Sequence, residues 1–116
     1  MSEVSGHYLE TYIISDIIKT YNSFGKDVKM SYYRDKEKNE IDLIMEVNHK
    51  IYPFEIKKTA NPTLHMIKNF SKLSDINQTV EAGGIICFYD SLMHLDEKNY
   101  IIPISSVINL RQNPKE

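Results

Sequence analysis

The sequence predicts an α/β domain in which helices flank a mixed β-sheet. Apolar residues repeat at helical spacing near the N-terminus and again after position 60, whereas period-two alternation dominates residues 27–57. Residues 85–89 are a continuous apolar run, which suits a strand buried on both faces. The expected element order is α-β-β-β-α-β-β, in a single domain spanning residues 1–116.

The first predicted helix covers residues 7–24, with Ser5 as its N-cap and Gly25 as its stop. Its apolar stripe consists of Leu9, Ile13, Ile14, Ile17, Ile18, Tyr21 and Phe24. Glu10 lies near the centre of this stripe, where an unpaired carboxylate is costly, so we expect it to be aimed at a functional site. The alternative is a first-turn acid that the helix dipole favours and whose carboxylate reaches solvent.

Three strands are expected next, over residues 27–34, 39–47 and 50–57. A charged turn joins the first two strands. Asn48 and His49 form a two-residue hairpin turn between the second and third, because Asn tolerates positive φ. The three strands are therefore predicted to form an antiparallel meander.

The register of this hairpin brings together the residues that could carry chemistry. Counting outward from the turn places Asp42 opposite Glu55, and Lys57 projects from the same strand face as Glu55. Two carboxylates about 5 Å apart repel each other. A divalent cation beside the lysine would offset this repulsion, with the Ile56 carbonyl as a further oxygen ligand, and Mg²⁺ or Mn²⁺ suits such donors. A solvated strand face with alternating charges explains the same spacing equally well.

A second helix is predicted after this hairpin, with Asn61 as N-cap and Pro62 at its first position. Its apolar face consists of Leu64, Ile67, Phe70 and Leu73. The cations that could follow a phosphate backbone are Lys58, His65, Lys68 and Lys72. An ordinary solvated helix face is the simpler explanation of those cations.

The remaining chain is expected to complete the sheet. Residues 74–82 form a loop or a short extra helix, and the strand at 85–89 carries Cys87 as a core residue. A further strand at 100–104 lies near an edge or a strand end because it contains Pro103. The tail at 109–116 is expected to fray.

Composition narrows the classes of function. The net charge of −2 argues against a generic polybasic nucleic-acid binder, so such affinity would need a local patch. No apolar run approaches the ~20 residues of a membrane span, and the polar N-terminus lacks a signal-peptide hydrophobic region. These features predict a cytoplasmic protein. The sequence contains no phosphate-binding loop of the Walker type and only one cysteine.

Asp42, followed after twelve residues by Glu55-Ile56-Lys57, resembles the PD-(D/E)xK nuclease superfamily, which has the restriction-endonuclease-like fold. More closely, the chain resembles the C-terminal domain of unknown function found on many prokaryotic AAA-type ATPases. The segments that carry this resemblance are 6–10, 33–35, 39–44, 53–57, 61–62, 83–84 and 102–104. The resemblance covers about residues 6–108.

The superfamily pattern implies roles for individual residues. Asp42 and Glu55 would be ligands of Mg²⁺ or Mn²⁺, Lys57 would position water, and Glu10 would be the auxiliary acid. The implied function is metal-dependent hydrolysis of phosphodiester bonds in DNA or RNA, with a homodimer as one way to clamp a duplex. The alternatives are a non-catalytic nuclease-like module that binds a protein or nucleic acid, and a simple dimerising domain.

Overall fold

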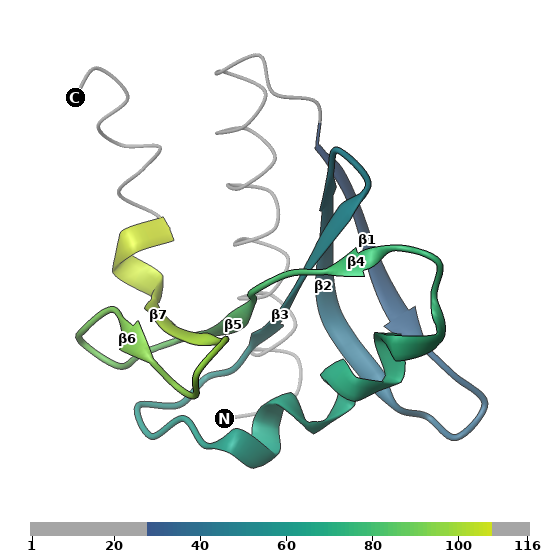
Figure 1. Cartoon of the computed structure of the whole chain (residues 1–116). Helices are drawn as coiled ribbons and strands as arrows, with labels where there is room; N and C mark the ends of the chain where they lie inside the picture. Colours follow the sequence, from purple (N-terminus) through teal and green to yellow (C-terminus); the bar gives the residue numbers. More distant parts are fainter. Residues whose placement is uncertain (1–27, 108–116) are drawn as a thin grey trace.

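The computed structural model describes residues 28–107. The elements in this range are β1 (Lys29–Arg34), β2 (Glu40–Val47), β3 (Lys50–Ile56), η1 (Leu64–Asp75), β4 (Thr79–Val80), β5 (Gly84–Cys87), β6 (Met93–His94) and β7 (Tyr100–Pro103). All seven of these strands belong to one mixed sheet, and η1 is a 3₁₀ helix (Figure 1). The predicted helix at 7–24, including Glu10, and the tail at 109–116 lie outside the described residues.

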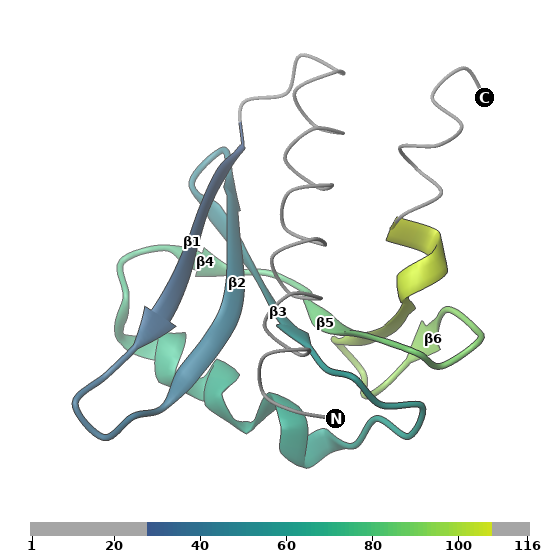
Figure 2. The ribbon, with the colours of Figure 1, turned by 180° about the vertical axis from the view of Figure 1, so that it is seen from behind.

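The sheet has an antiparallel half and a parallel half that share β3. Strands β1, β2 and β3 form the predicted antiparallel meander. On its other side β3 pairs in parallel with β5, and β5 pairs in parallel with β7. The strand order is β1-β2-β3-β5-β7-β6, and η1 lies in the connection from β3 to the parallel β5, as a crossover requires (Figures 1 and 2). This confirms the mixed α/β sheet.

The β2–β3 turn has the predicted form. Asn48 and His49 have φ values of 53° and 66°, and Val47 pairs with Lys50 across them. Positive φ at both central residues gives a turn whose twist matches that of the flanking strands. The predicted hairpin register is therefore confirmed as far as the pair of Leu43 with Phe54.

The second helix differs from its prediction in start and type. Thr63 is its N-cap rather than Asn61, and its N-terminal end has no capping hydrogen bond from a side chain. Ile67, with φ −108° and ψ 17°, divides η1 into two short segments. The apolar residues Leu64, Ile67, Phe70 and Leu73 are spaced by three throughout, which is the period of a 3₁₀ helix, so a 3₁₀ geometry keeps them on one face.

Three other boundaries differ from the predictions. Residues 79–80 form β4 beside β3, where a loop or helix was expected. Residues 93–94 form β6, the edge strand that pairs with β7, which was not predicted. Strand β5 ends at Cys87 rather than at residue 89, and Pro103 ends β7 as expected. A strand of two residues is too short to show a period-two pattern in the sequence. Such strands form because a longer neighbouring strand offers them hydrogen-bond partners.

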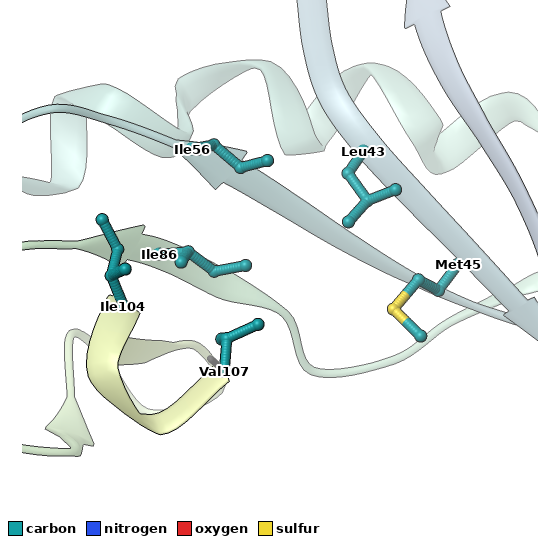
Figure 3. Packing of buried hydrophobic residues seen from close by; sticks show 6 residues of the cluster. All are labelled: Leu43, Met45, Ile56, Ile86, Ile104 and Val107. Carbon is teal, nitrogen blue, oxygen red and sulfur yellow. The ribbon is translucent and has the colours of Figure 1, made fainter. Parts of the chain in front are cut away.

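Both faces of the sheet are apolar. On one face, Leu43, Met45, Ile56 and Ile86 of the strands pack with Ile104 and Val107 of the helical turn that follows β7 (Figure 3). On the other face, buried residues of the strands pack against Ile67 and Leu73 of η1. The packing on this second face places η1 beside the carboxyl end of β3. No helix within residues 28–107 has the length and apolar character needed to cross a membrane.

Candidate functional site

The site begins with an irregularity in β2. Two residues of β2, Asp42 and Leu43, lie opposite the single residue Tyr32 of β1, because the pairing of the strands shifts there by one position. Such a bulge re-aims side chains, and bulges are frequent next to active sites. Leu43 is buried in the cluster of Figure 3, whereas Asp42 is half-buried and lines a pocket on the η1 side.

Strands β2 and β3 part at this bulge. Their ladder ends at Leu43 and Phe54, so Asp42 and Glu55 do not form the expected ladder pair. Instead, Asp42 Oδ2 accepts a hydrogen bond of 2.8 Å from the N–H of Ile56. A side-chain carboxylate thus takes the place of a main-chain acceptor. The N–H and C=O of one strand residue point to the same side, so the Ile56 carbonyl faces the side on which Asp42 lies.

Glu55 brings a carboxyl into the interior beside Asp42. Its exposed fraction is 3%, and its main chain pairs with Ile85 of β5. Burial raises the pKa of Glu55 to about 9, and the charge of Asp42 and a hydrogen bond with the Asp42 side chain act in the same direction. The Glu55 carboxyl is therefore protonated at neutral pH, and a bound cation would favour its ionised form.

Lys57 lies at the open side of this acid pair. Its Nζ is 3.9 Å from Oε1 of Glu55, and 42% of the Lys57 side chain is exposed. The Lys57 N–H donates to the carbonyl of Ile86 at 3.0 Å, which anchors the residue just beyond the end of β3. The ammonium lowers the pKa of Glu55, but burial outweighs this effect.

These three side chains open into one pocket of about 320 Å³ between the sheet and η1. The residues that line it are Lys38, Glu40, Asp42, Glu55, Lys57, His65, Met66, Lys68 and Asn69. The structure therefore brings together Asp42, Glu55 and Lys57, as the hairpin register predicted. It adds one wall from η1 and one from the β1–β2 turn.

The predicted cations divide into two groups. His65 and Lys68 line the pocket, whereas Lys58 and Lys72 do not. An α-helix would place residues 65, 68 and 72 on one face, but the three-residue turn of η1 aligns position 71 with the first two instead. Lys72 therefore does not line the pocket with His65 and Lys68, and the predicted contacts of these cations with a phosphate backbone stay a prediction.

Four lining residues were not among the predicted site residues: Lys38, Glu40, Met66 and Asn69. Asn69 Nδ2 donates to the carbonyl of Glu40 at 3.0 Å and so ties η1 to the start of β2. The spacing of Glu40 and Asp42 on one strand could have drawn attention to Glu40. No local signal could have found Lys38 or Asn69, because only the tertiary structure brings the turn and η1 to the strand ends.

The donor set suits a hard divalent cation. Two carboxylates and one carbonyl offer oxygen ligands only, and Mg²⁺ commonly binds through one or two carboxylates while it keeps several waters. The feature of this structure that fits a cation is the buried Glu55 carboxyl beside Asp42, whose ionised form a positive charge would favour. Among residues 28–107, no group of three or more His, Cys, Asp or Glu side chains forms a complete metal cluster. The predicted role of Glu10 lies outside the described residues and stays a prediction.

Comparison with known proteins places the chain in a family. No curated protein and no solved structure matched it. A family model described as a domain of unknown function, DUF4143, matches residues 5–107. This range contains every residue of the pocket. The chain therefore belongs to the DUF4143 family of domains of unknown function.

Proposed function

We propose that this domain is a metal-dependent phosphodiester hydrolase of the PD-(D/E)xK type, acting on DNA or RNA. The observation that carries the proposal is the pairing of buried Glu55 with Asp42 at the floor of an open pocket, with the Lys57 ammonium 3.9 Å from Glu55. A purely structural strand end gains nothing from a buried acid beside a half-buried one, because burial opposes ionisation. In a hydrolytic site, the same two acids would serve as ligands of the cation.

Each residue then has a distinct task. Asp42, Glu55 and the Ile56 carbonyl would hold Mg²⁺ or Mn²⁺, which when bound lowers the pKa of a water and polarises a phosphoryl oxygen. Lys57 neutralises charge on the reacting phosphate or orients the attacking water from the open side of the pocket. His65 and Lys68 contact the non-bridging oxygens of the strand from the η1 wall. A cytoplasmic location and a homodimer that clamps a duplex complete the proposal.

Two variants test this function. Asp42→Asn should abolish the Mn²⁺ binding that isothermal titration calorimetry detects in the wild type, whereas Asp75→Asn, at the exposed end of η1, should leave it unchanged. Lys57→Ala should slow Mn²⁺-dependent cleavage of single-stranded, duplex or branched DNA about 10²-fold or more, while Mn²⁺ still binds. A wild-type domain that binds no Mn²⁺ and cuts none of these substrates would refute the proposal.

A second candidate is a nuclease-like module that binds a partner without catalysis. The small size of the chain and its net charge of −2 favour it. In that case nucleic acid or a protein partner should bind without Mn²⁺, and Asp42→Asn and Lys57→Ala should leave that binding within about twofold of wild type. Loss of binding in either variant would instead show that the ligand binds in this pocket.

A further inference from the structure

Lys38 occupies a backbone conformation that lysine rarely adopts. Its φ is 65°, in the left-handed region where a Cβ is unfavourable and Gly or Asn is the usual residue. Non-glycine residues in this region persist only where their surroundings hold them, and they gather at functional sites. The chain places a long cation at a position where glycine would be easier to accommodate.

The turn between β1 and β2 holds Lys38 firmly. The Lys38 N–H donates to the carbonyl of Asp35 at 3.1 Å, and the Asp35 N–H donates to the carbonyl of Asn39 at 3.1 Å. The Asp35 carboxylate accepts from the N–H groups of Glu37 and Asn39, at 2.9 and 3.0 Å, and from Asn39 Nδ2 at 3.0 Å. These bonds lower the pKa of Asp35, so the turn is cross-linked by a charged acceptor across the working pH range.

Lys38 stands where two hollows meet. It lines the pocket of about 320 Å³ that contains the acid pair, and it also lines a neighbouring hollow of about 480 Å³ bordered by Arg34 and Glu40. Lys38 and Glu40 are common to both. A chain-like ligand that leaves the acid pair can therefore continue over the β1–β2 turn.

The charge at this shared rim is positive. Glu40 is paired with Arg34, whose Nε donates to Oε1 of Glu40 at 2.7 Å, so the acid at the rim is neutralised. The Lys38 ammonium makes no ion pair or hydrogen bond to another side chain within residues 28–107. The turn fixes the main chain of Lys38, and the side chain is exposed, so its ammonium can reach a ligand in either hollow.

We propose that Lys38 is a substrate-positioning residue that contacts a backbone phosphate of a nucleic-acid strand where the strand leaves the pocket over the β1–β2 turn. The identity of the ligand rests on the proposed function. The location of the contact rests on the two hollows and the held conformation of Lys38. The strand then runs past Lys38 and not past Lys58 or Lys72, which line neither hollow.

Lys38→Gly separates a role in binding from a role in folding. Glycine adopts positive φ without a steric cost, so the thermal midpoint should stay equal or rise. The affinity for a fluorescein-labelled single-stranded DNA oligonucleotide, measured by fluorescence anisotropy, should fall about three- to tenfold. The slope of log K against log salt should shrink by about 0.7, which corresponds to one lost phosphate contact. In cleavage assays KM should rise while kcat is unchanged.

Matched variants sharpen this test. Lys38→Arg should keep the affinity, and Lys36→Ala, an exposed lysine of the same turn that lines neither hollow, should leave it unchanged. Arg34→Ala should weaken binding because it leaves the Glu40 charge unpaired at the rim, and the double variant with Glu40→Gln should restore binding.

The outcomes distinguish this proposal from the proposed function. If the wild type binds the oligonucleotide without cleaving it, and Lys38→Gly loses this binding, the contact is supported and the hydrolase function is rejected. If the wild type cleaves the substrate and Lys38→Gly does not change KM, the contact is rejected and the proposed hydrolase function is retained. The contact is also rejected if Lys36→Ala weakens binding as much as Lys38→Gly does, or if the wild type does not bind the oligonucleotide.

Discussion

Glu55 places a carboxyl where water cannot stabilise its charge. With 3% of the residue exposed and Asp42 beside it, the protonated form is favoured, which raises the pKa to about 9. In the unfolded chain the same group has a pKa near 4.5. The folded state therefore binds this proton over a pH range in which the unfolded state releases it, and stability must depend on pH.

The sign of this dependence follows from the raised pKa. The contribution of Glu55 to the free energy of unfolding is greatest below pH 4.5 and falls as the pH rises toward about 9. At pH 7 without metal, the loss is about 3 kcal/mol, at roughly 1.4 kcal/mol for each pH unit above the unfolded pKa. Glu55→Gln should remove this loss, so the metal-free variant should be more stable than wild type at pH 8, with little difference at pH 4.

Urea unfolding at several pH values checks this prediction. The exposed acid Glu97 offers a control, because Glu97→Gln should leave the pH dependence as in wild type. Parallel pH profiles for wild type and Glu55→Gln would show that the Glu55 carboxyl is ionised in the folded state.

At the scale of elements, η1 forms one wall of the pocket. It contributes His65, Lys68 and Asn69 to the lining, and it is fixed to the sheet by buried Ile67 and Leu73. Its three-residue apolar spacing suits a 3₁₀ helix, and the backbone leaves helical geometry at Ile67. The packing of its apolar side chains, more than its backbone geometry, therefore sets the depth of the pocket.

Leu64 and Leu73 provide a matched pair for testing this packing. Leu73 is 2% exposed and packs with Ile41 and Ile51 of the sheet, whereas Leu64 is 56% exposed. Leu73→Ala should cost about 2–5 kcal/mol in the free energy of unfolding, and Leu64→Ala should change it by less than about 0.5 kcal/mol. Chemical denaturation measures both. Equal costs for the two variants would contradict the way in which η1 docks on the sheet.

At the scale of the whole molecule, the site occupies the boundary between the two halves of the sheet. Strand β3 pairs antiparallel with β2 and parallel with β5, and the pocket opens at its carboxyl end, where β2 turns away. Ligands in open α/β sheets bind beyond the carboxyl ends of strands, where neighbouring connections diverge. Here the divergence also exposes Asp42 and Lys57 to the pocket.

Metal binding at this boundary should stabilise the whole domain. A cation that binds only the folded state at 100 times its Kd adds about 2.7 kcal/mol to the free energy of unfolding. Mn²⁺ or Mg²⁺ should therefore raise the thermal midpoint of the wild type in differential scanning fluorimetry. Asp42→Asn and Glu55→Gln should lose this shift, and Asp75→Asn should keep it. An equal shift in Asp42→Asn would assign the ion to a different site.

The sequence by itself determined the hairpin and its register. Asn48 and His49 set the turn, and the period-two alternation on either side leaves one strand register that keeps the apolar residues buried. This register was enough to predict that Asp42, Glu55 and Lys57 lie together. The apolar run at 85–89 likewise identified the buried strand β5, because its short length and the preceding glycines favour a strand over a helix.

Only the tertiary structure decided the rest of the site. The bulge at Asp42, the end of the ladder before Glu55, and the arrival of Asn69 and Lys38 at the pocket depend on contacts between segments far apart in the chain. The short strands β4 and β6 form for the same reason, since their hydrogen-bond partners lie elsewhere. Local preferences fix turns and periodicity, whereas burial, the pKa of Glu55 and the shape of the pocket arise only when the two halves of the sheet and η1 come together.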